Sequence, residues 1–197
     1  MLHDLYGPGF ANRNLPLVRM LPTGWELMLA AAARGVNAPL ACGAGRLFDV
    51  AAALLGVRGR INYEGQAAVE LELAAAGARG RVLPYDVAVG EPLVVDFRPT
   101  FAALAAGVEA GTELAELAAS FHATLADATV AVVRRLAGAT GVKKVALGGG
   151  VFQNITLLRQ VTSRLAENYT VLLPRQIPPN DGGLALGQAA VARERSC

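Results

Sequence analysis

A run of three glycines followed by polar residues forms the first loop whose residue types suit ligand binding. Gly148, Gly149 and Gly150 follow a short apolar run, and Asn154 stands at the expected start of a helix. Glycines allow backbone N–H groups to approach a ligand closely, and the N-terminus of a helix attracts negative charge. The phosphate or ribose of a nucleotide could lie against this loop. The alternative is a tight turn in which Asn154 only caps the helix, because a glycine run alone is a weak signal.

A second loop places one carboxylate in an equivalent position. The segment 178–183, PPNDGG, joins an expected strand to the last expected helix. Its Asp181 could bind a divalent metal ion or a metal-bound phosphate. The alternative is that Asp181 caps the helix, which is the commoner role of a lone aspartate. We expect both loops at one edge of the sheet, where ligands bind in open α/β folds.

A third segment, GRLFD at positions 45–49, opens another expected helix. Asp49 could accept hydrogen bonds from ribose hydroxyls, and Arg46 could meet a phosphate. The alternative is a surface arginine with an aspartate that interacts favourably with the helix dipole.

The other side chains able to do chemistry give weaker signals. His122 lies beside the apolar stripe of the longest expected helix, so we expect it to have a structural role. His3 lies in an irregular segment and receives no assignment. Cys42 and Cys197 form neither a disulfide framework nor a zinc-binding spacing, and no adjacent histidine supports Cys42 as a nucleophile.

The helices and strands that position these residues are predicted from hydrophobic periodicity and from the glycines and prolines that mark turns and loops. Residues 1–24 are rich in glycine and proline and are expected to be irregular. Helices are expected over residues 25–34, 47–55, 65–76, 101–106, 112–138, 154–167 and 182–193, with Thr112 as an N-cap. Strands 82–89 and 93–97 should form a hairpin, and strands 143–147 and 169–173 should pair in parallel through a right-handed helical crossover.

Composition narrows the class of protein. The chain has 197 residues, of which 53% are hydrophobic and 17% charged, and its net charge is +2. These values exclude a disordered chain, and the absence of a Lys/Arg block argues against nucleic-acid binding. No apolar run is long enough to span a membrane, and the first 20 residues do not resemble a signal peptide. We therefore expect a cytoplasmic protein in a reducing compartment.

Taken together, the motifs resemble a known family. The matching segments are GRLFD (45–49), AALLG (52–56), YEGQAA (63–68), GGVFQN (149–154), LLPR (172–175) and PPNDGGLALGQ (178–188). Over roughly residues 25–192 the chain resembles the C-terminal region of the HypF carbamoyltransferases, which are related to the tRNA threonylcarbamoyltransferases. The resemblance implies an α/β, helix-rich fold that is part of an actin-like ATPase (ribonuclease H-like) lobe. Residues 25–197 would be the C-terminal part of the transferase domain, after an irregular segment 1–24.

The resemblance also implies a reaction and its residues. Carbamoyl-adenylate, made from carbamoyl phosphate and ATP, would donate its carbamoyl group to the C-terminal cysteine of a HypE-like protein during [NiFe]-hydrogenase maturation. By motif, Asp49 and Gly65 would hold the nucleotide ribose and its surroundings. Gly149, Gly150 and Asn154 would bind the nucleoside, and Asp181 would be a ligand of a divalent metal ion.

Departures from the family pattern leave alternatives open. The family's first lobe carries a pair of metal-binding histidines, but the two histidines here lack that spacing. One interpretation is a split transferase that works with a separate N-terminal HypF piece, in which case a large apolar surface should be exposed. A second is a non-catalytic module that binds a nucleotide or docks on a partner. A third is a truncated product without function.

Overall fold

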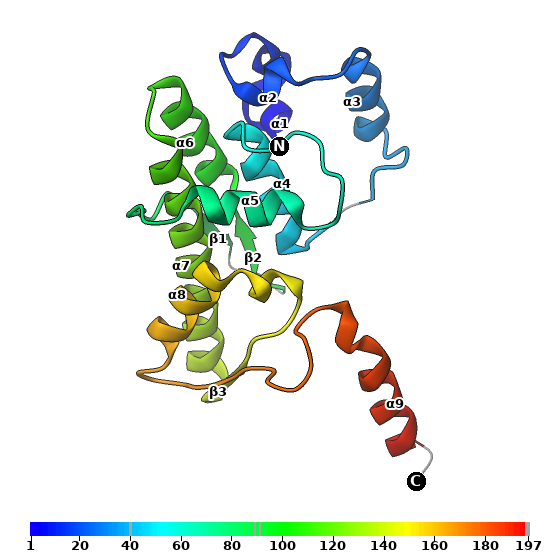
Figure 1. The fold of residues 1–197 in the computed structure, drawn as a ribbon, viewed down its shortest axis with the longest axis vertical. Coiled ribbons are helices and arrows are strands. Elements are labelled where there is room, and N and C mark those ends of the chain that lie inside the picture. The colour runs from blue at the N-terminus through cyan, green and yellow to red at the C-terminus, as the bar shows by residue number, and fades with distance from the viewer. Residues whose placement is uncertain (40, 89, 91, 196–197) are drawn as a thin grey trace.

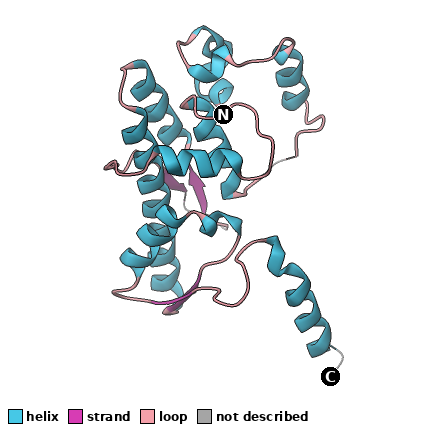
Figure 2. Cartoon of the chain, viewed as in Figure 1, coloured by secondary structure: helices cyan, strands magenta, loops and turns pink. Residues whose placement is uncertain are grey.

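Helices dominate the fold, which also contains two small sheets, one among the helices and one at the lower end of the view (Figures 1 and 2). The computed structural model describes residues 1–39, 41–88, 90 and 92–195. The α-helices are α1 (Leu2–Tyr6), α2 (Pro16–Arg19), α3 (Trp25–Ala33), α4 (Ala44–Leu54), α5 (Gln66–Ala74), α6 (Arg98–Glu109), α7 (Leu114–Thr140), α8 (Ile155–Leu165) and α9 (Leu184–Arg195). Three short 3-10 helices are η1 (Gly7–Asn12), η2 (Gly150–Gln153) and η3 (Asp181–Gly183). Among the described helices, none combines the length and the apolar composition that crossing a bilayer requires.

Both predicted strand pairs are confirmed, although the strands are shorter than expected. Strands β1 (Asp86–Ala88) and β2 (Val94–Asp96) pair antiparallel, with Val87 opposite Val95. Strands β3 (Lys144–Ala146) and β4 (Thr170–Leu172) pair in parallel, and α8 is the crossover between them. The carboxyl ends of β3 and β4 therefore lie at the same edge, which places the two candidate loops on one side of this sheet.

Helix α7 is the element around which the core is built. It contacts α5, α6 and α8. The predicted apolar stripe is confirmed in its middle, where Leu117, Phe121, Leu125 and Ala128 are buried, but not at its ends, where Leu114 is exposed and Val132 is half-buried. The ring of Phe121 meets that of Phe48 on α4 edge to face, with centroids 5.1 Å apart. The helix begins after Glu113 rather than at the predicted cap Thr112.

The first 24 residues are not irregular, which corrects the expectation for this segment. They contain α1, η1 and α2, and Leu2, Phe10 and Leu15 are buried. Pro8 and Pro16 occupy the first turns of η1 and α2, where a missing N–H group costs nothing. The prolines and glycines therefore delimit short helices here instead of preventing them.

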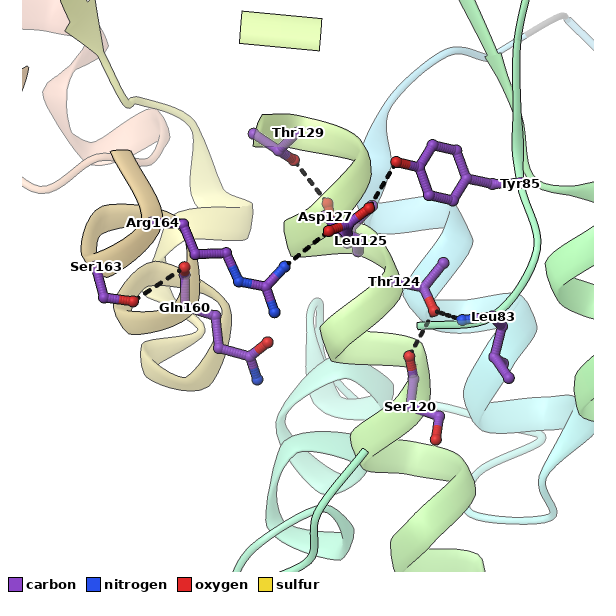
Figure 3. A network of polar contacts seen from close by, with 10 residues as sticks. All are labelled: Leu83, Tyr85, Ser120, Thr124, Leu125, Asp127, Thr129, Gln160, Ser163 and Arg164. Atoms are coloured by element: carbon purple, nitrogen blue, oxygen red, sulfur yellow. Dashed lines mark hydrogen bonds and ion pairs between the residues drawn. The ribbon is translucent and has the colours of Figure 1, made fainter. Parts of the chain in front are cut away.

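The predicted strand 82–89 is also corrected, because only residues 86–88 of it are paired in β1. The N–H groups of Arg81 and Leu83 donate to the side-chain hydroxyls of Ser120 and Thr124 on α7, at 3.1 and 2.8 Å. Figure 3 shows the Leu83–Thr124 bond. Since α7 side chains satisfy these backbone groups, the segment runs along the helix instead of joining a sheet. Val89 lies outside the described residues, as does Cys197.

A polar clamp fixes the other end of this segment. The Tyr85 hydroxyl donates to Asp127 at 2.7 Å, and Arg164 of α8 approaches the second oxygen of the same carboxylate at 3.2 Å (Figure 3). Burial and the neighbouring carboxylate raise the pKa of Tyr85 to about 12. One side chain of α7 thus joins the 79–85 segment to α8.

Candidate functional site

The two candidate loops touch one another. The N–H of Gly149, after β3, donates to the carbonyl of Pro179, after β4, at 2.7 Å. A Cβ placed on Gly150 would lie 3.7 Å from the Cβ of Asn180. The prediction that both loops share one edge of the sheet is therefore confirmed. Gly149 has a φ of +96°, a backbone conformation that favours glycine, so the turn itself requires this residue.

Asn154 is the best-anchored residue of the first loop. It is buried, and its Oδ1 accepts a hydrogen bond from the N–H of Leu157 at 2.8 Å as the N-cap of α8. Its Nδ2 lies 3.0 Å from Nε2 of His122 on α7. The capping role is thus present, and one carboxamide N–H of Asn154 is engaged by His122. Contact between Asn154 and a nucleoside remains a prediction.

The N-terminus of α8 is largely occupied by protein groups. Glu72 of α5 accepts from the N–H of Thr156 at 2.7 Å, and Asn154 accepts from that of Leu157. Two of the N–H groups that a phosphate would use are therefore already bonded. This end of the loop therefore offers fewer free N–H groups to a phosphate than an uncapped helix N-terminus would.

His122 has the structural surroundings expected of it, and also a partner that the sequence did not reveal. Its side chain is fully buried, and its Nδ1 lies 2.8 Å from the carbonyl oxygen of Ala118. The rings of Phe48 and Phe121 contact it edge to face. Burial lowers the pKa of His122, and the hydrogen bond to Ala118 and the charge of Glu72 oppose that shift only partly.

This lowered pKa predicts a pH dependence of folding. The unfolded chain takes up a proton at His122 below about pH 6.5, whereas the folded chain stays neutral to a lower pH. We expect the free energy of unfolding to fall in this window as pH decreases, by at most about 1.4 kcal/mol per pH unit from this group. Urea denaturation of the wild type and of His122→Gln between pH 8 and 5 measures the difference in slope. Equal slopes would contradict this assignment.

Asp181 is exposed in η3 and does not cap the helix. The last helix, α9, begins only at Leu184, so Asp181 is not at its N-cap position, and the cap of η3 is Asn180, whose Oδ1 accepts from the N–H of Gly182 at 3.0 Å. Within residues 1–39, 41–88, 90 and 92–195, no three His, Cys, Asp or Glu side chains cluster closely enough to hold a metal ion. The described residues alone therefore do not fit a complete metal site, and Asp181 would need ligands from elsewhere.

The third candidate segment reaches the same region through α4, which contacts η2. Asp49 lies within α4, partly exposed, and pairs with Arg46 at 3.0 Å. Gly65 precedes α5 with a φ of +82°. Arg46 is on the exposed surface, as the simpler alternative expected, but Asp49 lies beyond the first turn of α4 and pairs with Arg46, so the expected interaction with the helix dipole is wrong. The structure also brings α4 beside the first loop.

A network that sequence reasoning missed holds the turn around Gly65. Gln66 accepts from the N–H of Asn62 at 2.7 Å and donates to Glu70 at 2.9 Å. Arg58 makes two hydrogen bonds to Glu70, at 2.7 and 2.6 Å, and these lower the pKa of that carboxyl. Residues 58–66 are therefore tied to the first turns of α5. These residues lie close in sequence, but no periodic pattern reveals their pairing.

Comparisons with known proteins agree with the motifs. The sequence profile described as carbamoyltransferase, Kae1-like domain, second subdomain, matches residues 1–188. Carbamoyltransferase HypF of Rhodobacter capsulatus is 45% identical over 168 residues, covering 85% of this chain and 22% of that protein. A tRNA N6-adenosine threonylcarbamoyltransferase of Geotalea uraniireducens is 35% identical over 136 residues, covering 63% of this chain and 36% of that protein.

A crystal structure of full-length HypF in the phosphate- and nucleotide-bound form matches with a TM-score of 0.85 and 32% identity. The match covers 90% of this chain and 24% of that one. It confirms the predicted fold class, a mixed α/β, helix-rich lobe of the actin-like type. The chain spans less than a quarter of the length of these two HypF proteins.

Proposed function

Because this chain belongs to the carbamoyltransferase HypF family, we propose that it forms the C-terminal lobe of a split carbamoyltransferase. The lobe works with a separately supplied N-terminal HypF piece. Together they transfer the carbamoyl group of carbamoyl-adenylate to the C-terminal cysteine of a HypE-like protein, in the cytoplasm, during [NiFe]-hydrogenase maturation.

The observation that supports this proposal most directly is the backbone hydrogen bond between the two motif loops. Gly149 of GGVFQN donates to Pro179 of PPNDGG, at the shared edge of β3 and β4. In the proposal Gly149, Gly150 and Asn154 contact the nucleoside of ATP or of carbamoyl-adenylate, and Asp49 and Gly65 contact its ribose and surroundings. The nucleotide-bound form of the HypF crystal structure supports a nucleotide as the ligand.

The contribution of this lobe to the reaction is positioning. A thiolate of the partner attacks the carbamoyl carbon, a C–S bond forms, the bond from that carbon to the phosphate oxygen breaks, and AMP leaves. Holding the nucleotide in one place makes this attack effectively intramolecular. Asp181 would supply one ligand of a divalent metal ion. The remaining ligands would come from the N-terminal piece, because the described residues do not complete that site.

Exposed apolar side chains support the need for a second piece. Helix α9 extends away from the body of the fold (Figure 1), and Leu184, Leu186 and Val191 on it are each more than half exposed. Leu172 of β4 is about half exposed, and within the described chain β3 and β4 form a sheet of only two strands. Apolar surface of this kind is characteristic of a region that packs against another protein part.

The alternative function is a non-catalytic module that binds a nucleotide or docks on a maturation partner. The lack of a complete metal site within the described residues favours it. Calorimetry with ATP and Mg²⁺ on the chain alone, and then with the N-terminal piece and a HypE-like protein, separates the two. Binding and carbamoyl transfer only in the mixture support the split transferase. Binding by the chain alone, without transfer in the mixture, supports the module.

A further inference from the structure

We propose that His122 is a positioning residue that fixes the side-chain amide of Asn154 and thereby sets the affinity of the site for the nucleoside. This inference rests on the proposed function for its ligand. It assigns a role to a buried histidine that lies 32 residues away in sequence and belongs to neither binding loop.

The hydrogen bonds determine a single protonation pattern. The Oδ1 of Asn154 must face the N–H of Leu157, because only an acceptor fits there. Its Nδ2 is therefore a donor, and Nε2 of His122 must accept from it. The other ring nitrogen, Nδ1, faces a carbonyl oxygen and must carry the proton.

This chain of bonds prevents the amide of Asn154 from turning over. A rotation by half a turn would place the Asn154 oxygen against the lone pair of Nε2 and its NH₂ group against the N–H of Leu157. Both buried groups would lose their partners, and unsatisfied buried polar groups are costly. One N–H of the Asn154 amide is left for a ligand, and its direction is set by His122.

His122 also lies where two candidate binding segments meet. Its ring packs against Phe48 of α4, with centroids 5.4 Å apart and planes at 70°. Phe48 directly precedes Asp49, the proposed ribose contact. His122, which belongs to α7, therefore contacts α4 through its ring and the first loop through its Nε2.

The neutral form of His122 is required for this role. An imidazolium would present an N–H group to the N–H of Asn154. The groups around the ring are the carbonyl of Ala118 on α7, the rings of Phe48 and Phe121, and Asn154 at the start of α8. Glu72 on α5 is the charged group whose field reaches His122.

Two substitutions separate positioning from simple packing. In His122→Gln, the side-chain oxygen can take the place of Nε2 and accept from Asn154. In His122→Asn, the shorter amide can take the place of Nδ1 and bond to Ala118, but it cannot reach Asn154. Both variants remove the ring, so their melting temperatures should fall by similar amounts.

The readout is ATP affinity by calorimetry, in the condition under which the wild type binds. We expect His122→Asn to weaken binding about tenfold, the effect of losing one useful hydrogen bond, and His122→Gln to retain affinity within about threefold. In a double-mutant cycle, His122→Asn should cause no further loss once Asn154 is replaced by Ala. Affinity that follows melting temperature in both variants, or losses that simply add in the cycle, would overturn the inference.

A direct measurement on the wild type serves if a variant does not fold. ¹⁵N NMR should show the proton of His122 on Nδ1 and a scalar coupling between Nε2 and Nδ2 of Asn154. A proton on Nε2, or no coupling, overturns the inference whatever the variants do. If the wild type binds no nucleotide alone or in the mixture, both the proposed function and this inference are wrong. If the wild type binds and His122→Asn binds equally well, only the inference fails.

Discussion

Replacing Gly80 with alanine is expected to destabilise the fold by about 3 kcal/mol, the upper end of the usual cost of overpacking. A Cβ on Gly80 would lie 2.2 Å from the backbone carbon and oxygen of Ala119 and 2.4 Å from the nitrogen of Ser120. These atoms belong to the backbone of α7, so no side-chain rotation relieves the overlap. The 79–85 segment would have to move away from the helix. The bond from the N–H of Arg81 to Ser120, next to the substitution, would break first.

A glycine on α7 itself provides the control. Gly138 lies near the end of α7, and nothing is within 4 Å of the Cβ that it lacks. Alanine there should stabilise the protein by about 0.5–1 kcal/mol, because glycine is a poor residue for a helix interior. Urea unfolding of both variants, followed by circular dichroism, measures the contrast. A small effect of Gly80→Ala would show that the segment does not lie against α7 as described.

The segment around Gly80 is also where the strand predicted from the sequence differs from the structure. Residues 82–89 have the β-branched composition of a strand, and the predicted hairpin with 93–97 does form. Pairing nevertheless starts only at Asp86, because Thr124 accepts the N–H of Leu83. Nothing in a local pattern shows that a hydroxyl 41 residues away will satisfy a backbone group. Thr124 and Ser120 read simply as polar interruptions of an apolar helix.

Hydrophobic periodicity predicted the structure best where the pattern within a single element, or the order of elements, was sufficient information. The stripe on α7 and the β3–α8–β4 order were predictable, since the first needs only helical spacing and the second only the order of elements. The short helices of residues 1–24 were missed, because proline and glycine mark the ends of helices as readily as they mark loops. Burial of Phe10 and Leu15 against the rest of the chain decides between those two outcomes.

The candidate site also contains features that the sequence predicted and features that it did not. The meeting of the glycine loop with the PPNDGG loop followed from the parallel strands alone, and the Gly149–Pro179 bond confirms it. The alternative that Asp181 caps the last helix is wrong, because that helix begins only at Leu184, and the short η3 before it is capped by Asn180. The partnership of His122 with Asn154 required a tertiary contact that the sequence does not encode locally.

Replacing Asp181 with asparagine is expected to lower carbamoyl transfer by the reconstituted mixture about a hundredfold or more, and to remove the dependence of nucleotide binding on Mg²⁺. Loss of a residue that merely supports a metal ligand already costs ten- to a hundredfold, so loss of a ligand should cost at least as much. The fold should be unaffected. Asp181 is exposed, and the capping bond in η3 belongs to Asn180.

The choice of control gives this experiment its meaning. Glu167 is an exposed carboxylate after α8, outside both motif loops, so Glu167→Gln removes the same charge at a distance from the proposed site. If both variants lose activity equally, net charge or docking explains the result and not a ligand at Asp181. If Asp181→Asn keeps both transfer and Mg²⁺ dependence, the metal assignment is wrong. The Gly149–Pro179 contact would then retain its meaning as the nucleoside side of the site, since that contact does not involve the carboxylate.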